Sequence, residues 1–208
     1  MLDAPIRKLI DPPLNWVAAR LVAIGLGANA VTVVGFAVGA AGCVAIGLKW
    51  YIVALVLILL NRLADGLDGP IARRTGATDL GGFLDVVLDT VFYSGVPFAF
   101  AVSDTTLTLP AAFLIYSFVG TGGSFLAYAV IAAKRGMSTA VHGRKSFFYS
   151  VGLMEGTETV VFLVLFCLLP QYFAVLAWVF GGLCWVTTAL RIASGVAAFR
   201  QPPAGGCG

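Results

Sequence analysis

Charged residues are scarce in this chain. Only 11% of its 208 residues are charged, 60% are hydrophobic, and the mean hydropathy is +0.97. Soluble globular domains carry about 25% charged residues, so this composition argues against a soluble domain. The sequence therefore predicts an integral membrane protein.

Cysteine and histidine are also few. The cysteines form no Cys-x-x-Cys pair, and three of them lie in apolar runs. We interpret them as small hydrophobic residues rather than as disulfide partners or metal ligands. The single histidine, His142, falls in a predicted loop, and we interpret it as exposed rather than catalytic.

The N-terminal region differs from the rest of the chain. We expect no cleavable signal, because charged residues and the Pro12-Pro13 pair precede the first sustained apolar run. The segment Pro13–Gly25 contains Arg20 and is too short and too polar to span a bilayer, so we predict an amphipathic helix at the cytoplasmic interface. Residues 1–28 form the interfacial region of one membrane-embedded catalytic domain (1–200), and 201–208 are predicted to be a disordered tail.

Six apolar runs follow, separated by glycine, proline and polar residues. A hydrocarbon core of about 30 Å requires roughly 20 residues of helix, which these runs supply. We therefore predict an all-α fold with six transmembrane helices, at residues 29–48, 50–74, 80–102, 108–134, 149–169 and 171–198.

Basic residues fall almost entirely on one side of these spans, and only Lys49 lies on the other. By the positive-inside rule, we expect a multi-pass protein of the cytoplasmic (inner) membrane with both termini in the cytoplasm. The loops after the second and fourth spans would then be cytoplasmic too. The basic residues on that side are Arg7, Lys8, Arg20, Arg73, Arg74, Lys134, Arg135, Arg144, Lys145 and Arg200.

Four aspartates lie where a membrane-spanning chain should tolerate them least. Asp65 and Asp68 are near the cytoplasmic end of the second predicted span, and Asp85 and Asp89 are near the cytoplasmic start of the third. Spacings of three and four residues place each pair on one face of a helix. An Asp deep in a bilayer costs roughly 2.5–3.5 kcal/mol on insertion scales, which favours a functional site. We expect this site to face the cytosol.

Ion pairs with arginine are one way to compensate these charges, and Arg62, Arg73 and Arg74 lie nearby. Three arginines cannot neutralise four aspartates one to one, so we favour bound cations. Arg62, three residues before Asp65, is interpreted as an ion-pair partner. Carboxylate oxygens suit hard cations, and the pattern predicts two Mg²⁺ or Mn²⁺ ions, which commonly act on phosphates.

Small and basic residues beside the aspartates fit a phosphate ligand. Gly69 and Gly82 lack side chains where the two carboxylate helices are expected to approach each other, which would admit a ligand to the backbone. Arg73 offers a planar fork suited to a phosphate. Gly35 and Gly39, in the first span, form a small-xxx-small pair that we interpret as packing within the chain rather than a dimer seam.

Residues 65–89 match the pattern Asp-x-x-Asp-Gly-x-x-Ala-Arg-x8-Gly-x3-Asp-x3-Asp at every fixed position. In this the chain resembles the CDP-alcohol phosphotransferase (phosphatidyltransferase) family. The six-span plan, the interfacial helix and the Asn29-x-x-Thr32 opening of the first span are also similar to that family. The resemblance implies an enzyme that moves a phosphatidyl group from CDP-diacylglycerol to the hydroxyl of a small alcohol and releases CMP.

The resemblance also implies residue roles and partners. A two-metal site would be built by Asp65, Asp68, Asp85 and Asp89, with Asp89 as the base on the acceptor hydroxyl. The CDP moiety would be bound by Gly69, Ala72, Arg73 and Gly82, together with Asn29 and Thr32. The implied partners are a CDP-linked lipid donor, a small alcohol, the bilayer and a second copy in a homodimer. We expect no nucleic acid.

Residues that bind the acceptor alcohol are harder to identify. Glu155 and Glu158, near the cytoplasmic start of the fifth predicted span, are predicted to contact it, because carboxylates would suit a cationic amine or a polyol. Arg144 and Lys145 could hold a phosphorylated acceptor, or could serve only to set the topology.

Two other functions share some of these features. An intramembrane prenyltransferase also uses aspartates and Mg²⁺, although its motifs usually recur on separate halves of a larger bundle. A cation transporter could use the aspartates as an ion pathway, although they lie at one membrane face and no inverted repeat is evident. Release of CMP would distinguish the first function from both.

Overall fold

The computed structural model describes residues 3–136 and 156–200, and within these ranges the chain is all-helical, as predicted. Five of the predicted spans match observed helices to within two residues at each end. The remaining one, the fifth predicted span at 149–169, is described only from Gly156. The helices are α1 (Asp3–Ala23), α2 (Ala28–Gly47), α3 (Tyr51–Thr75), α4 (Asp79–Ser103), α5 (Thr108–Lys134), α6 (Gly156–Leu168) and α7 (Phe173–Phe199), with 3₁₀ turns η1 (Thr105–Leu107) and η4 (Pro170–Tyr172).

Four helical segments of the described chain are long and apolar enough to cross a membrane. They are Ala28–Gly47, Asp79–Ser103, Thr105–Lys134 and Pro170–Phe199. Helix α3 is not among them because Arg62, Asp65 and Asp68 fall within every 18-residue stretch of it. The described part of α6 is apolar but has only 13 residues. The second and fifth predicted spans therefore remain predictions.

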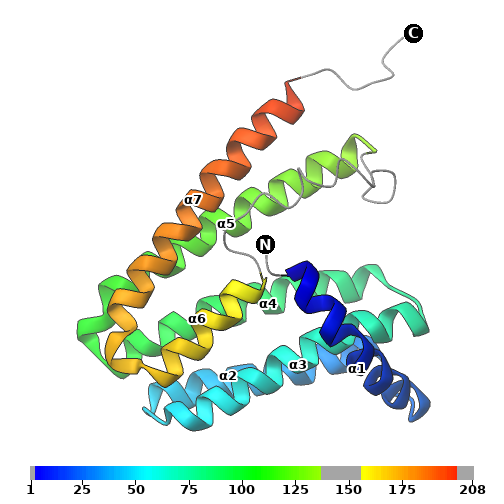
Figure 1. Cartoon of the computed structure of the whole chain (residues 1–208), viewed down its shortest axis with the longest axis horizontal. Helices are drawn as coiled ribbons and strands as arrows, with labels where there is room; N and C mark the ends of the chain where they lie inside the picture. Colours follow the sequence, from blue (N-terminus) through cyan, green and yellow to red (C-terminus); the bar gives the residue numbers. More distant parts are fainter. Residues whose placement is uncertain (1–2, 137–155, 201–208) are drawn as a thin grey trace.

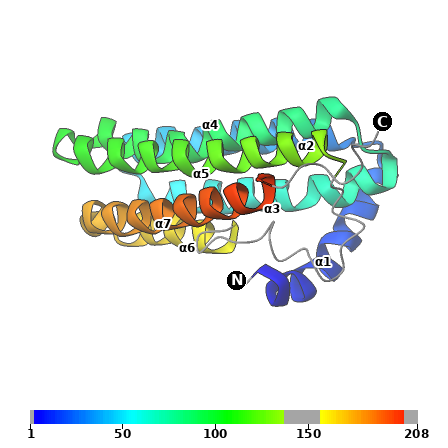
Figure 2. The same ribbon diagram turned by 90° about the horizontal axis from the view of Figure 1, so that it is seen from above.

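Helix α2 is the centre of the N-terminal half, because it packs against α3 and also against α4. Helix α5 packs along α7 and contacts α4, and α6 packs against α3 and α7. Figure 1 shows α5 and α7 running side by side and obliquely away from the body formed by α1 to α4, and Figure 2 shows α4 and α5 on one side of the molecule with α6 and α7 on the other.

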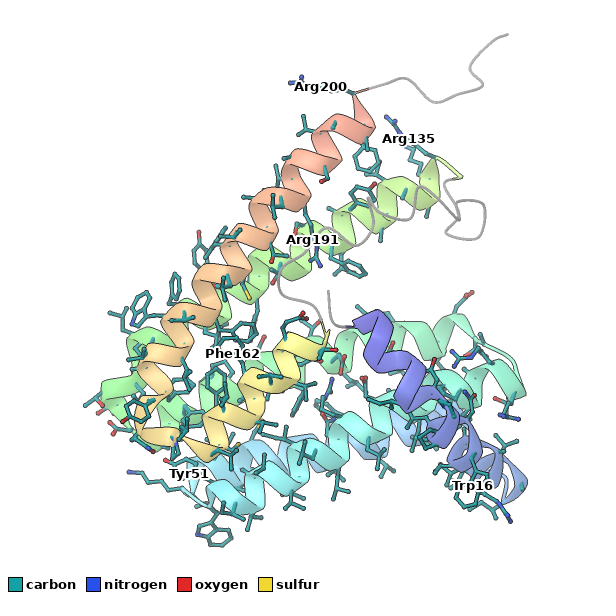
Figure 3. All side chains as sticks on the ribbon, viewed as in Figure 1. Trp16, Tyr51, Arg135, Phe162, Arg191 and Arg200 are labelled. Carbon is teal, nitrogen blue, oxygen red and sulfur yellow. The ribbon has the colours of Figure 1, made fainter. Side chains whose placement is uncertain are left out.

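Aromatic rings join the two halves at the end where α3 begins and α4 ends. Phe100 of α4 stacks on Phe173, with ring centroids 4.1 Å apart, and on Tyr51, at 5.8 Å. Phe162 of α6 stacks on Phe180 of α7 at 4.4 Å. Figure 3 places Tyr51 and Phe162 at this end, far from Trp16. Lipid tails are as apolar as these rings, so the hydrophobic effect does little to hold helices together in a bilayer. The van der Waals contacts between the closely packed rings stabilise the bundle instead. The acidic motif lies towards the other end of α3.

Helix α1 begins earlier than predicted. We expected a helix from Pro13, because a proline inside a helix loses one hydrogen bond and clashes with the preceding turn. The observed helix starts at Asp3 and continues through Pro12 and Pro13. The chain accommodates them by bending, as Figure 2 shows. The position of α1 at a membrane interface remains a prediction.

One face of α1 packs behind the acidic motif. Ala18 is fully buried against Leu67 and Ile71 of α3, whereas Trp16 is 64% exposed on the opposite face. The guanidinium of Arg74 also donates to the Asn15 carbonyl of α1, over 3.3 Å. Helix α1 therefore supports the half of α3 that carries Asp65 and Asp68.

Candidate active site

The acidic residues of α3 and α4 converge although the two helices do not lie along each other. Each packs along α2 instead, and the Arg62 side chain of α3 reaches Asp89 of α4. Carboxylate oxygens of Asp65, Asp68 and Asp85 lie within 4.8 Å of one another. We call these three residues the carboxylate cluster. All three are partly buried, which fits residues that meet a polar ligand at the end of an apolar bundle.

Helix α2 also contributes directly to this region. The Thr32 hydroxyl donates to Asp68 Oδ2 over 2.8 Å and lies 3.1 Å from the Ala28 carbonyl of its own helix. Second contacts of this kind orient a carboxylate before it binds a cation. Thr32, singled out in the sequence only for a CDP contact, thus fixes the direction of a cluster carboxylate.

A cavity of about 440 Å³ adjoins the carboxylate cluster. Asp68, Asp85 and Thr32 line it on one side, and the segment between α3 and α4 lines it on another. The predicted CDP-binding residues on its wall are Asn29, Thr32, Gly69, Ala72 and Gly82. Its size falls within the range of about 300–1,000 Å³ typical of small-molecule sites.

The glycines of the motif open onto this cavity rather than onto an opposing helix. A Cβ built on Gly82 would meet no heavy atom within 4 Å, and one on Gly69 would meet only Arg73 Nη1, at 3.4 Å. Both glycines lie on the wall of the cavity, and the expectation that they admit a ligand to the backbone stays a prediction. Arg73 is not among the residues that line the cavity, although its guanidinium lies beside Gly69.

Gly81, next to the motif glycine, was not singled out from the sequence. A Cβ there would lie 2.8 Å from Asn29 Oδ1 and 3.2 Å from Thr78 Oγ1. Thr78 caps α4 by accepting a hydrogen bond from the Gly81 N–H over 3.0 Å. The absent side chain therefore lets α2 approach the start of α4. In the sequence, a threonine three residues before a glycine at the start of an apolar run was the signal that could have pointed to Thr78 and Gly81 as a helix cap.

A second hollow, of about 10 Å³, lies on the other side of the cluster. It shares Thr32, Asp68 and Asp85 with the larger cavity, and Asp89 and Asn61 also line it. This volume is enough for about one water molecule. Asp68 and Asp85 therefore border both the cavity of about 440 Å³, which could hold a small molecule, and the hollow of about 10 Å³, which could hold one water molecule or ion.

Asp89 lies outside the carboxylate cluster and forms an ion pair with Arg62. Arg62 Nη2 lies 2.7 Å from Asp89 Oδ1, and Nη1 lies 3.5 Å from Asp65 Oδ2. The prediction that Arg62 is an ion-pair partner is confirmed, but its shorter contact crosses to α4 instead of staying on α3. Among the described residues, no arginine lies within ion-pair distance of Asp68 or Asp85, and Arg74 donates to the α1 backbone instead.

Packing around α2 explains how these groups come so close. A Cβ on Gly35 would lie 2.7 Å from Ala64 Cβ, and one on Gly39 would lie 2.7 Å from Phe92 Cδ2. Asn61, which sequence reasoning missed, is buried and donates to the Gly35 carbonyl over 2.9 Å. The interpretation of Gly35 and Gly39 as packing positions within the chain is confirmed. An asparagine inside an apolar run was the available signal for Asn61.

Most of the residues predicted to bind the acceptor lie outside the part of the chain that the structure describes. Arg144, Lys145 and Glu155 lie outside the described residues, as does His142. Glu158 lies in the first turn of α6 and is half-buried. Contact of these residues with an acceptor remains a prediction.

Known proteins resemble this chain over most of its length. The chain is 47% identical over 202 residues to the inner membrane protein YnjF of Escherichia coli (strain K12), covering 97% of this chain and 98% of that protein. It is 28% identical over 117 residues to an archaetidylinositol phosphate synthase of Pyrococcus horikoshii, covering 53% of this chain and 62% of that one.

A solved structure and a family model are also similar to this chain. The crystal structure of Mycobacterium tuberculosis phosphatidylinositol phosphate synthase (PgsA1), with CDP-DAG bound, has a TM-score of 0.64 at 19% identity, covering 88% of this chain and 93% of that one, which shows a shared fold. The model of the CDP-alcohol phosphatidyltransferase family matches residues 26–193, a range that contains the carboxylate cluster, Arg62 and the cavity. The chain therefore belongs to the CDP-alcohol phosphatidyltransferase family.

Proposed function

We propose that this protein transfers a phosphatidyl group from CDP-diacylglycerol to the hydroxyl of a small alcohol and releases CMP. The observation that carries the proposal is the carboxylate cluster beside a cavity of about 440 Å³, whose wall includes Asp68 and Asp85 together with three further motif residues, Gly69, Ala72 and Gly82. Family membership favours this function over the prenyltransferase and the cation transporter considered from the sequence.

The cluster suits a divalent cation. Its donors are all carboxylate oxygens, the ligands that Mg²⁺ and Mn²⁺ prefer. Opposite ligands of one octahedral Mg²⁺ are about 4.2 Å apart, so oxygens up to 4.8 Å apart would close slightly around one ion or be shared by two. Asp65, Asp68 and Asp85 would hold the ions, two according to the motif. When bound, they would neutralise the diphosphate of the donor and stabilise the CMP leaving group.

The cavity suits the CDP group of the donor. Gly69 and Gly82 leave its wall open to a flat or phosphorylated group, and Arg73 lies beside Gly69 with a fork suited to phosphate oxygens. Leu80 and Phe83 are exposed on α4 next to the cavity, with Phe83 63% exposed, and the diacylglycerol chains would lie along this surface. The donor would thus have its head among polar groups and its tails in lipid.

Transfer requires a base for the acceptor hydroxyl. Asp89 lines the small hollow beside the cluster, and Arg62 engages one of its two carboxylate oxygens. The other oxygen would take the proton as the acceptor oxygen forms its bond to the β-phosphorus of the donor, which carries the diacylglycerol. The bond from that phosphorus to the bridging oxygen breaks, and CMP leaves with the electron pair. General-base catalysis of this kind is typically worth about 10²–10⁴-fold.

The relatives support the donor, the location and an order of acceptors to test. The structure of M. tuberculosis phosphatidylinositol phosphate synthase contains CDP-DAG, and YnjF is named as an inner membrane protein. We infer a multi-pass inner-membrane enzyme with both termini and the site facing the cytosol, active as a homodimer. Two relatives are named as inositol phosphate lipid synthases, so inositol phosphate is the first acceptor to try.

The test is release of CMP by the purified protein in detergent, with CDP-diacylglycerol and Mn²⁺ or Mg²⁺. Acceptors would be inositol phosphate, inositol, glycerol 3-phosphate, serine, choline, ethanolamine, glycerol and phosphatidylglycerol, each added alone. We expect CMP release that depends on one acceptor, with the lipid product identified by mass spectrometry. Absence of CMP release with every acceptor, combined with no metal-dependent binding of CDP, would reject the proposal.

A further inference from the structure

Arg62 links the two helices that carry the acidic residues. Its side chain is only 8% exposed, and its guanidinium contacts Asp89 of α4 and Asp65 of α3. It is therefore a cation built into the protein at the place where divalent cations are expected.

The surroundings of Arg62 fix the guanidinium in place. Its Nε donates to Asn61 Oδ1 over 2.8 Å, and its Nη1 donates to the Tyr93 hydroxyl. The guanidinium carbon lies 4.7 Å from the ring centroid of Phe92 and 4.8 Å from that of Tyr93. Contacts with two aromatic rings and hydrogen bonds from several nitrogens leave the guanidinium little freedom to move, because all of them require one orientation.

The four aspartates differ in how they relate to the Arg62 cation and to one another. The carboxylate cluster contains three of them, and Asp89, held at 2.7 Å by Arg62, lies outside it. Without Arg62, Asp89 would be free to turn towards any cation bound by the other three. A carboxylate that ligates a metal is a weak base, because the metal withdraws the electrons that would accept a proton.

We propose that Arg62 is a positioning residue that keeps Asp89 from joining the carboxylate cluster as a full metal ligand, so that Asp89 stays available to the acceptor hydroxyl. The role of Asp89 in this inference rests on the proposed function. The effect of Arg62 on metal affinity does not, because it follows from charge and contact alone. Arg62 thus opposes metal binding while it supports turnover, whereas a purely structural ion pair would support both.

The experiment measures Mn²⁺ binding without substrate, by isothermal titration calorimetry, beside the rate of CMP release for the same variants. Removing one positive charge in contact with two carboxylates should tighten Mn²⁺ binding about tenfold or more in Arg62→Met. Its kcat should fall about 10²-fold or more, since the base is no longer held in place. The KM for CDP-diacylglycerol should change little.

Two further variants control for folding and charge. Arg62→Lys keeps the charge but cannot reach Asp89, Asp65 and Tyr93 together, so its Mn²⁺ affinity should stay near wild type while kcat falls about tenfold. Arg20→Met removes an exposed arginine of α1 whose guanidinium lies 5.3 Å from the Trp16 ring centroid, and should alter neither quantity. A thermal melt in detergent shows whether each variant is folded.

Opposite movements of metal affinity and kcat in Arg62→Met would support the proposal. If that variant is folded and binds Mn²⁺ no more tightly than wild type, Arg62 is only a structural partner and the proposal is overturned. If Arg62→Met does not fold, Arg62→Lys decides: a wild-type kcat overturns the proposal, and a reduced kcat with unchanged affinity supports it. Failure of CMP release in the wild-type protein would reject the proposed function but leave the Mn²⁺ comparison valid.

Discussion

The hydroxyl of Thr32 offers a sensitive test of the carboxylate cluster. Thr32→Val preserves the shape of the side chain but removes the 2.8 Å hydrogen bond to Asp68 Oδ2. A hydrogen bond to a charged group is worth about 1.5–3 kcal/mol, and the nearby Ala28 carbonyl at 3.1 Å shares part of this hydroxyl. Loss of about 1.4 kcal/mol or more corresponds to at least about a tenfold effect, and contacts behind metal ligands typically contribute about 10–100-fold to affinity or activity.

The assay follows CMP release as Mn²⁺ is titrated, at saturating donor and acceptor. We expect the Mn²⁺ concentration for half-maximal rate to rise about 10–100-fold in Thr32→Val and to return towards wild type in Thr32→Ser, which restores the hydroxyl. Thr90→Val is a matched control, because the Thr90 hydroxyl bonds to the Val86 carbonyl of its own helix. An unchanged Mn²⁺ titration for Thr32→Val, in a protein that melts normally, would refute the argument that Thr32 orients a metal-binding carboxylate.

Three further results are expected. Asp89→Asn should lower kcat about 10²–10⁴-fold while CDP-diacylglycerol still binds, because the amide keeps the shape but cannot accept the proton; turnover near the wild-type rate would contradict the assignment of the base. Gly81→Ala should raise the KM for the donor about tenfold in a steady-state titration, since its Cβ would lie 2.8 Å from Asn29 Oδ1 and displace that side chain, whereas Gly122→Ala, where a Cβ would meet nothing within 4 Å, should not. Chelation by EDTA should abolish CMP release, and excess Mg²⁺ or Mn²⁺ should restore it; activity that persists in EDTA would show that the carboxylate cluster does not act through a cation.

Much of the fold and part of the site follow from local rules. Helix bounds could be read from apolar runs, because a bilayer fixes their length and the breaks between them carry glycine, proline or charge. The pairing of Asp65 with Asp68 on one face of α3 follows from helical periodicity alone. Arg62 could be recognised as an ion-pair partner, because an arginine one turn from an aspartate in an apolar setting needs a counter-charge.

What depends on the packing of three helices could not be predicted. Helix α2 packs against both α3 and α4, and its residues Asn29 and Thr32 line the cavity with Gly69 and Gly82. Nothing in the local sequence around either glycine specifies this third helix. The same holds for Arg62, whose closer partner is Asp89, 27 residues away, rather than Asp65. The start of α1 was also missed: intrinsic preference predicts a start at Pro13, whereas the helix begins at Asp3 and continues through both prolines. The described contacts of α1 with α3 come from residues after Pro13 and do not explain the earlier start.

The small residue at position 39 has a consequence beyond helix packing. A methyl group there would press on the Phe92 ring at 2.7 Å and on Asn61 Nδ2 at 2.9 Å. Those two side chains are also the ring beneath the Arg62 guanidinium and the amide that accepts its Nε–H. Gly39 is thus two contacts away from Arg62, and three from the proposed base Asp89, by two separate routes. Selection at this position would then act on turnover as well as on assembly, and a variant that folds normally could still be slow.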